Sequence, residues 1–204
     1  HHNRSSGHFL RAMRDRAVAD DLRAVRQVLW LAWRERTRTV VVESNHDQAL
    51  VRWLDDPSGH KDLVNSRLWH MLNAEYMQDG FSDSMVRTAL DVVGRIPAGT
   101  VFLHEDQSFR IGEDDGIECG MHGHRGPNGR RGSPAAFRDL GVRVNIGHTH
   151  SAGITGGVYC AGVSGSLDMQ YNRGPSSWSH SHIVTYNNSK RCIVRMQGDT
   201  FRWR

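Results

Sequence analysis

The sequence predicts an α/β fold, with a helix-rich part over residues 1–98 and a strand-rich part over residues 99–204. Over Gly7–Arg36 the apolar residues recur at steps of three and four, as in a helix with one buried face. The second part contains short apolar and β-branched runs separated by glycine- and asparagine-rich turns, a pattern typical of strands. A chain of 204 residues is long enough for one compact domain and short for two, so we expect a single domain over 1–204.

The individual elements follow from local patterns. Thr39–Glu43 contains three consecutive valines and predicts a buried strand after the first helix, so that helices and sheet form layers. Residues 60–95 predict two helical segments separated by a break at Asp79-Gly80. Asn187–Lys190 is expected to be the turn of a terminal hairpin. Further strands are expected at Val101–Leu103, Phe109–Ile111, Ile117–Cys119, Val142–Ile146, Gly157–Cys160, His182–Tyr186 and Cys192–Met196.

The charge of the chain is compatible with an anionic partner. The net charge is +4, and Lys61 and Lys190 are the only lysines, so arginine carries nearly all the positive charge. The planar guanidinium suits phosphate, although a genome rich in G and C would also favour arginine codons. The basic balance therefore permits a polyanionic partner such as DNA without demonstrating one.

Cysteine content and hydropathy indicate the compartment. Three cysteines, an odd number without a CxxC pair, favour reduced thiols in a cytoplasmic protein over a disulfide framework. No apolar run approaches the ~20 residues that a membrane-spanning helix needs, and no secretory signal is expected. We therefore expect no membrane partner.

The first block with chemical potential is Ser44-Asn45-His46-Asp47, directly after the predicted strand at Thr39–Glu43. Open α/β sheets place their ligands at the carboxyl ends of strands. The Asn45 amide oxygen can bind a metal, His46 can donate a proton, and Asp47 can fix the tautomer of that imidazole.

The second block is His122-Gly123-His124, which also follows a predicted strand. Imidazole binds borderline divalent metals well at neutral pH. We expect the two side chains to diverge, so that one binds metal while the other faces substrate or solvent. The loop continues through Arg125, Arg130 and Arg131 among glycines, which allow close approach to a phosphate while the arginines neutralise it.

The third block is Gly147-His148-Thr149-His150, where two more imidazoles follow the end of a predicted strand. Taken together, the three blocks resemble the calcineurin-like metallophosphoesterase superfamily, whose signature runs DxH, GDxxD, GNH(D/E), H(G), GHxH. The resemblance covers residues 44–150 and the last three elements of that signature. It implies a β-sandwich flanked by helices.

The resemblance also implies roles for individual residues. Asn45, His122 and His148 would ligate one metal, and His150 would ligate the second. His46 would stabilise charge on the phosphorus or protonate the leaving oxygen, and Asp47 would orient it.

The implied reaction is metal-dependent hydrolysis of a phosphate ester. Two divalent ions, Mn²⁺ first and Mg²⁺, Fe or Zn²⁺ as alternatives, would activate a hydroxide that attacks phosphorus in line. His124, Arg125, Arg130 and Arg131 would contact the phosphate. The HGHRGPNG stretch and the C-terminal part resemble phage-encoded metallophosphoesterases, including those of T-odd coliphages that degrade host DNA. This closer resemblance implies a DNase acting in the host cytoplasm.

The chain departs from the superfamily signature in two places. Ser44 stands where the signature block GNHD has its glycine, and this replacement is tolerable if the φ of Ser44 is negative. No DxH or GDxxD precedes Asn45, so we expect a truncated or split protein. A missing N-terminal segment or a second chain would complete the site, and a homo-oligomer is left open. By itself this chain should hold at most one weakly bound metal.

Two alternatives compete with the DNase hypothesis. One is a phosphomonoesterase or protein phosphatase with the same metal core. The other is a non-catalytic scaffold that kept the fold and lost the metals, which the missing motifs favour. Four tryptophans at helical spacing are interpreted as core residues rather than base-stacking residues. They are Trp30, Trp33, Trp53 and Trp69.

Overall fold

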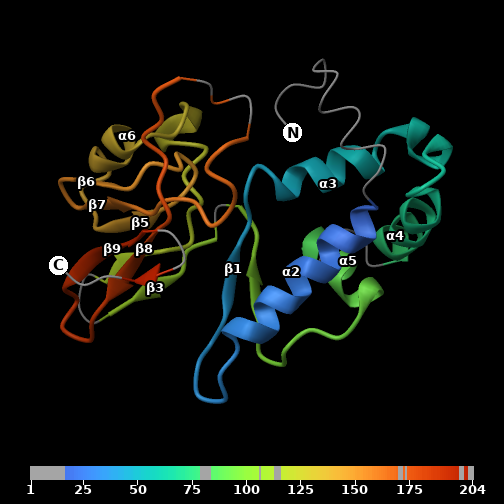
Figure 1. The fold of residues 1–204 in the computed structure, drawn as a ribbon, viewed down its shortest axis with the longest axis horizontal. Coiled ribbons are helices and arrows are strands. Elements are labelled where there is room, and N and C mark those ends of the chain that lie inside the picture. The colour runs from blue at the N-terminus through green and yellow to red at the C-terminus, as the bar shows by residue number, and fades with distance from the viewer. Residues whose placement is uncertain are drawn as a thin grey trace. The chain divides into compact units, whose positions relative to one another are not determined.

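The computed structural model describes residues 17–78, 84–105, 107–112, 116–169, 172, 174–197 and 200–201. The chain divides into two compact units, unit 1 over residues 1–104 and unit 2 over residues 105–204. Within the described residues, helices dominate unit 1 and strands dominate unit 2 (Figure 1). The chain is thus mixed α/β, and the expected change of character at residue 98/99 lies close to the division between the units.

Unit 1 contains α2 (Val18–Ala32), α3 (Asp47–Leu54), the 3₁₀ helix η1 (Pro57–Lys61), α4 (Ser66–Gln78) and α5 (Met85–Val93). The helix expected over Gly7–Arg36 corresponds to α2, and its first ten residues lie outside the described part. The expected end at Arg36 is wrong. The helix stops at Ala32 because Trp33 adopts extended backbone (φ −62°, ψ 138°), while its N–H still closes the last turn onto Leu29 O.

Two parallel strands accompany these helices. β1 (Val40–Val42) pairs in register with β2 (Val101–Leu103), with Val41 opposite Phe102. The chain between them passes through α3, η1, α4 and α5, so the expected layering of helix and sheet is present in unit 1. The β1 side chains are half-buried rather than fully buried, which corrects the expectation of a buried strand.

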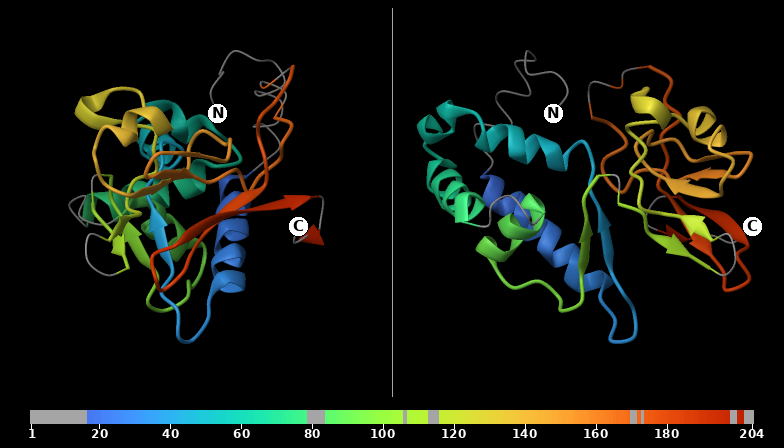
Figure 2. Two further views of the ribbon diagram at one scale, coloured as in Figure 1. Left: turned by 90° about the vertical axis from the view of Figure 1, so that its left-hand side faces the viewer. Right: turned by 180° about the vertical axis from the view of Figure 1, so that it is seen from behind.

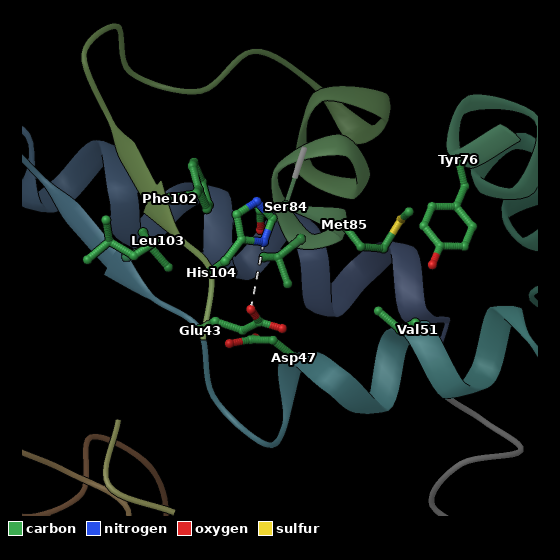
Figure 3. Close-up of a pocket in the computed structure, with 11 residues that line it drawn as sticks. Glu43, Asp47, Val51, Tyr76, Ser84, Met85, Phe102, Leu103 and His104 are labelled. Carbon is green, nitrogen blue, oxygen red and sulfur yellow. Dashed lines mark ion pairs between the residues drawn. The ribbon is translucent and has the colours of Figure 1, made fainter. Parts of the chain in front are cut away.

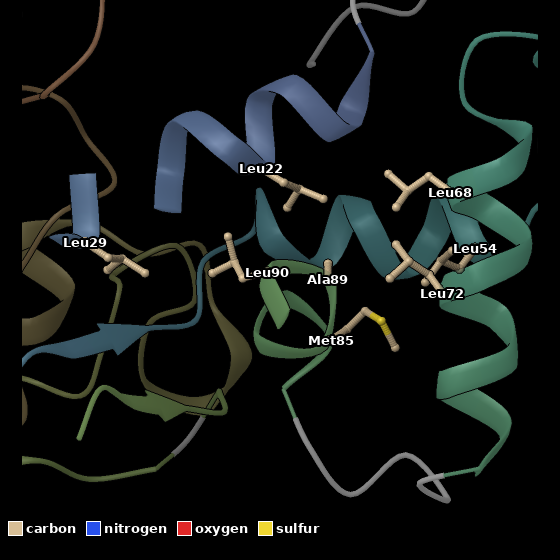
Figure 4. Packing of buried hydrophobic residues seen from close by; sticks show 8 residues of the cluster. All are labelled: Leu22, Leu29, Leu54, Leu68, Leu72, Met85, Ala89 and Leu90. Atoms are coloured by element: carbon tan, nitrogen blue, oxygen red, sulfur yellow. The ribbon is translucent and has the colours of Figure 1, made fainter. Parts of the chain in front are cut away.

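The core of unit 1 is an aliphatic cluster contributed by four helices (Figure 4). Its fully buried members are Leu72, Ala89 and Leu90, and the others are Leu22, Leu29, Leu54, Leu68 and Met85. Leu22 and Leu29 lie seven residues apart, on one face of α2. Only a narrow stripe along α2, which contains these two leucines, is therefore buried.

The expected burial of the tryptophans holds for only two of the four. Trp53 and Trp69 pack against the core. Trp30 and Trp33 are 43% and 37% exposed, because the Leu22–Leu29 stripe takes the buried face of α2. Trp30 Nε1 donates a hydrogen bond to Arg95 O at 3.0 Å. The interpretation of Trp30 and Trp33 as core residues is therefore wrong.

Unit 2 contains two sheets, which Figure 2 shows from two further directions. The five-stranded sheet has the order β3-β4-β5-β7-β6, and the three-stranded sheet has the order β10-β9-β8. β4, β5 and β7 run parallel, while β8 and β9 form an antiparallel hairpin. The bounds are β3 (Arg110–Ile111), β4 (Ile117–Glu118), β5 (Val144–Ile146), β6 (Gly153–Thr155), β7 (Val158–Cys160), β8 (Ser181–Thr185), β9 (Arg191–Gln197) and β10 (Thr200–Phe201).

The strand predictions for this part are confirmed, with small shifts at the ends. The hairpin predicted at Asn187–Lys190 is confirmed by the β8–β9 pairing. Four short elements of unit 2 were not predicted. They are β6, β10, the 3₁₀ helix η2 (Pro127–Gly129) and the helix α6 (Pro134–Arg138), which Ser133 caps through its hydroxyl. All four are too short for a periodic pattern to stand out in the sequence.

The two sheets of unit 2 are joined by the guanidinium of Arg191 on β9. It donates to Val144 O at 2.9 Å, Asn145 Oδ1 at 3.0 Å and Gly157 O at 2.8 Å. Its carbon lies 4.0 Å from the centre of the Tyr159 ring, a cation–π contact. Burial lowers the pKa of Arg191 from its usual value, and these acceptors and the ring replace the water that the cation has lost.

A second buried charge, Glu118 on β4, fixes the strand next to β5. Its carboxylate accepts hydrogen bonds from the Ser108 hydroxyl, from Phe109 N at 3.0 Å and from Gly120 N at 2.7 Å. Arg110 Nε lies 3.6 Å away. Burial by itself would raise the pKa of Glu118, but these donors outweigh burial and the net pKa is lowered.

All three cysteines are free thiols. Burial raises the pKa of Cys119 and of Cys160 above the usual value, which keeps these two thiols protonated and unreactive at neutral pH. Among the helices that the structure describes, none has the length and apolar character that a membrane span requires.

Truncation of Leu90 to alanine should destabilise the protein by about 2–5 kcal/mol, because it leaves a cavity between α5 and α2. Urea unfolding followed by circular dichroism measures the change. Leu63→Ala is the control, since Leu63 is 94% exposed while Leu90 is 0% exposed. It should change the stability by less than about 0.5 kcal/mol. Equal effects of the two substitutions would contradict the assignment of this core.

Glu118→Gln should cost about 1–2 kcal/mol near neutral pH, because hydrogen bonds to a charged acceptor are stronger than those to a neutral one. The folded-state pKa of Glu118 is lowered, so its contribution is fully present above the unfolded pKa of about 4.3 and disappears as pH falls through the folded pKa. Urea unfolding of both proteins between about pH 7 and pH 3 should show the difference shrinking towards acid. A difference that stays constant with pH would contradict this role of the carboxylate.

Candidate functional site

The first group of candidate residues lies in unit 1, in the turn between β1 and α3. His46 is the N-cap of α3 and Asp47 is its first residue. Asp47 Oδ2 accepts hydrogen bonds from Ser44 N at 2.7 Å and from Ser44 Oγ at 2.8 Å. Asp47 therefore holds the turn closed through Ser44, and its expected role in orienting His46 stays a prediction.

Ser44 explains how the chain tolerates the loss of a glycine at this point. Its φ is not positive, so no steric demand for glycine exists there. Its hydroxyl also bonds Asp47, which a glycine could not do. The structure therefore meets the requirement that Ser44, in place of glycine, does not have a positive φ.

Asn45 contributes the amide oxygen that the sequence analysis singled out as a metal ligand. Asn45 Oδ1 is buried, and no described residue donates a hydrogen bond to it. The Asn45 backbone carbonyl, in contrast, accepts a bond from Arg52 at 3.4 Å. A buried amide oxygen without a donor costs free energy unless a ligand binds it, so this atom fits a cation ligand.

A pocket beside this turn is also part of unit 1 (Figure 3). Glu43, Asp47 and His104 contribute its polar groups, and His104 Nδ1 lies 3.9 Å from Glu43 Oε2. The rest of the lining is largely apolar, with Val51 and Phe102 among its residues. Sequence reasoning missed Glu43 and His104, although Glu43 is the last residue of one predicted strand and His104 directly follows another.

The second group of candidate residues is a histidine cluster in unit 2, formed by His122, His124 and His148. The ring centroids of His122 and His148 are 5.3 Å apart, those of His122 and His124 are 5.6 Å apart, and those of His124 and His148 are 6.0 Å apart. The expected divergence of His122 and His124 is wrong. The chain bends at Gly123, whose φ is +105°, and both rings lie near His148, with centroids 5.3 Å and 6.0 Å from its ring.

Backbone geometry at two strand ends builds this cluster. His122 follows β4, His148 follows β5, and Gly147 N donates to His122 O at 2.9 Å. Gly123 has φ +105°, and a side chain there would press on Ile146. His148 adopts φ 65°, which is uncommon for a residue with a side chain. Such strained positions concentrate at functional sites.

His150 also adopts positive φ, 61°, but its described ring contact is different. It meets the Trp178 ring edge to face, with centroids 4.3 Å apart. The structure thus brings three of the four expected histidines of unit 2 together and places His150 against an indole. Its role as a ligand of a second metal stays a prediction.

The arginine loop of unit 2 is closed by backbone pairing. Arg125 and Arg131 form an antiparallel bridge, and Gly126 N donates to Arg130 O at 2.7 Å. Gly132 N donates to His124 O at 3.0 Å, and a Cβ at Gly132 would lie 1.9 Å from Gly123 O. Only glycine fits there, so the loop is held directly against the backbone of the histidine cluster.

All three arginines of this loop are exposed to solvent. Arg130 Nη2 lies 3.7 Å from Asp139 Oδ2. Arg125 Nε lies 3.2 Å from Glu105 Oε1. Exposed guanidinium groups in a glycine-rich loop can bind phosphate, and the binding of phosphate by these three arginines stays a prediction.

Glu105 is a site residue that sequence reasoning missed. Its Oε1 lies 3.0 Å from His124 Nε2 as well as 3.2 Å from Arg125 Nε. The signal that could have found it is its position two residues after the predicted strand Val101–Leu103, where ligand-binding side chains gather.

The donors of the histidine cluster suit a borderline divalent cation. Imidazole nitrogens bind such ions at about 2.0–2.1 Å, which puts the centroids of two imidazoles on one tetrahedral ion on the order of 5 Å apart. The 5.3 Å between His122 and His148 fits this spacing. Among the residues that the structure describes, no three His, Cys, Asp or Glu side chains form a ready group for a metal ion.

Comparison with known proteins indicates where the chain comes from. It is similar to Protein A1 of Escherichia phage T5, with 47% identity over 211 residues that cover 98% of this chain and 37% of that protein. The chain therefore spans 37% of the length of this relative. No protein-family model matches the chain, and no solved structure matches it. The similarity supports a phage origin, as the resemblance to proteins of T-odd coliphages predicted.

Proposed function

We propose that this chain is part of a metal-dependent phosphoesterase with a calcineurin-like fold that hydrolyses phosphodiester bonds of DNA. The observation that carries the proposal is the histidine cluster of unit 2. His122 and His148 lie 5.3 Å apart at the ends of two strands that follow the expected motif order. The strained φ of His148 supports a functional rather than a purely structural role.

The proposal assigns His122 and His148 of unit 2 as ligands of one metal, and it keeps the amide oxygen of Asn45 in unit 1 as a metal ligand. His150 is assigned to a second metal. When bound, the divalent ions would supply an activated water and neutralise charge on the phosphate. The remaining ligands, which the absent DxH and GDxxD motifs carry in the superfamily, are proposed to come from another segment or a second chain.

The other residues act on the substrate. Arg125, Arg130 and Arg131 hold the phosphate through charge-assisted hydrogen bonds. His46, placed at the start of α3, donates the proton to the leaving oxygen. Asp47 keeps this turn in place through its two bonds to Ser44.

DNA is proposed as the substrate because of the arginine loop and the similarity to a phage protein. Under this proposal the reaction takes place in the host cytoplasm. A phosphomonoesterase or protein phosphatase would use the same metal ligands, so only the choice of substrate separates these activities.

A non-catalytic scaffold is the second candidate. It is favoured by the finding that the described residues hold no ready group of three metal-binding side chains. In a scaffold, substitution of the clustered histidines would leave the function of the protein unchanged.

His148→Ala should lower hydrolysis of bis-p-nitrophenyl phosphate and of plasmid DNA by about 100-fold or more, because a metal ligand supports several kcal/mol of transition-state stabilisation. Activity is measured in Mn²⁺ on the whole polypeptide that contains this chain. His182→Ala is the matched control, since His182 is an exposed histidine on β8 of the same unit. Faster cleavage of p-nitrophenyl phosphate than of the diester would favour the monoesterase, and an inert wild-type protein would favour the scaffold.

The purified 204-residue chain should retain at most one transition metal, held weakly, because the carboxylates of the absent motifs are not part of it. Inductively coupled plasma analysis after dialysis gives the metal content per chain. Two tightly held metals would show that this chain contains a full ligand set and that the assignment of ligands is wrong.

A further inference from the structure

Glu105 contacts two residues of the proposed site at once. Its Oε1 is the atom that lies 3.0 Å from His124 Nε2 and 3.2 Å from Arg125 Nε. The side chains of Glu105 and His124 are only 21% and 14% exposed, whereas that of Arg125 is 53% exposed. A shielded carboxylate therefore lies between an imidazole of the histidine cluster and the first arginine of the loop.

This contact distinguishes the two nitrogens of His124. A carboxylate next to Nε2 favours the tautomer with the proton on that nitrogen, which leaves the lone pair on Nδ1. Both ring nitrogens of His124 are buried, and neither makes a hydrogen bond of regular geometry with a described residue. What separates them is the Glu105 carboxylate, which lies 3.0 Å from Nε2. The ring lies 5.6 Å from that of His122 and 6.0 Å from that of His148, centroid to centroid. In the tautomer that the carboxylate favours, the lone pair is therefore on Nδ1, the nitrogen that does not face Glu105.

We propose that Glu105 is a positioning residue of the histidine cluster. It holds His124 in the Nε2–H tautomer, so that Nδ1 is an acceptor for a divalent cation or for a donor on a metal-bound ligand. It also holds the Arg125 guanidinium at the base of the loop. The inference rests on the proposed function for the identity of the ligand, a divalent cation with a phosphate ester.

The charges around Glu105 favour a positioning role for its carboxylate over direct binding of a metal by that carboxylate. An unpaired carboxylate next to a phosphate site would repel the substrate. Arg125 neutralises Glu105, so the carboxylate adds no net negative charge beside the loop. Glu105 can therefore orient His124 without lowering the affinity of the loop for phosphate.

The tautomer is tested by two-bond ¹H–¹⁵N correlation spectra of the metal-free 204-residue chain at about pH 8, above the ordinary pKa of imidazole. His124 signals are assigned by their loss in His124→Asn. The wild-type chain should show His124 with the proton on Nε2. Glu105→Gln, which keeps the shape and removes the charge, should give a mixture of tautomers. Glu75→Gln is the matched control, because Glu75 is an exposed glutamate on α4 of unit 1.

The affinity for Mn²⁺ alone is measured on the same variants by electron paramagnetic resonance. Glu105→Gln should raise the Kd for Mn²⁺ by about 10- to 100-fold, the usual loss when a residue that orients a ligand is removed. Glu75→Gln should leave the Kd unchanged. Thermal unfolding of each variant separates this effect from a loss of stability.

Several outcomes would overturn the inference. One is a wild-type His124 that carries its proton on Nδ1, a result that needs no variant. Another is a Glu105→Gln chain that is less stable but keeps the wild-type tautomer and Mn²⁺ affinity, which would make Glu105 a structural ion-pair partner. A wild-type chain that shows the Nε2–H tautomer and binds no Mn²⁺ would count against the proposed function, while the tautomer of Glu105→Gln would still decide the role of Glu105.

Discussion

The histidine cluster of unit 2 depends on one half-buried cation. Arg191 binds Val144 O, Asn145 Oδ1 and Gly157 O, and so ties the β8–β9 hairpin to β5 and β7. His148 follows β5 after a single glycine, so the position of its imidazole is set by a strand that this guanidinium holds. A charge buried with all its partners is costly to disturb, because removing one partner leaves the others desolvated. The histidine cluster therefore rests on a rigid polar link between two sheets.

Around that link, the site is assembled from short-range steric requirements. Gly123 and Gly132 are needed where backbones approach closely, and His148 accepts a strained φ at the end of its strand. These constraints hold the imidazoles of the cluster near one another and hold the arginine loop against them. Glu105 adds an electrostatic contact, because its carboxylate lies next to both an imidazole of the cluster and Arg125. Under the phosphoesterase proposal, a site made in this way is preorganised for a cation and a phosphate.

Unit 1 follows a different principle. Its helices pack around an aliphatic core in which Leu72, Ala89 and Leu90 are fully buried, and its two parallel strands are only half-buried. The turn after β1 is stabilised by the Asp47–Ser44 bonds and presents a buried amide oxygen on Asn45. The phosphoesterase proposal assigns this oxygen to a metal because amide oxygen is a suitable ligand and the atom has no described donor.

The sequence by itself determined the elements whose signals are local. It predicted β1, β2, the β8–β9 hairpin and the three histidine blocks, because periodicity and turn chemistry act over a few residues. Tertiary structure decided the rest. Trp30 is exposed because another stripe of α2 is buried, and Glu105 meets His124 only after folding. Arg191 lies 47 residues from its acceptor Val144. Contacts between residues so far apart leave no periodic trace in the chain, because they depend on how complete elements pack.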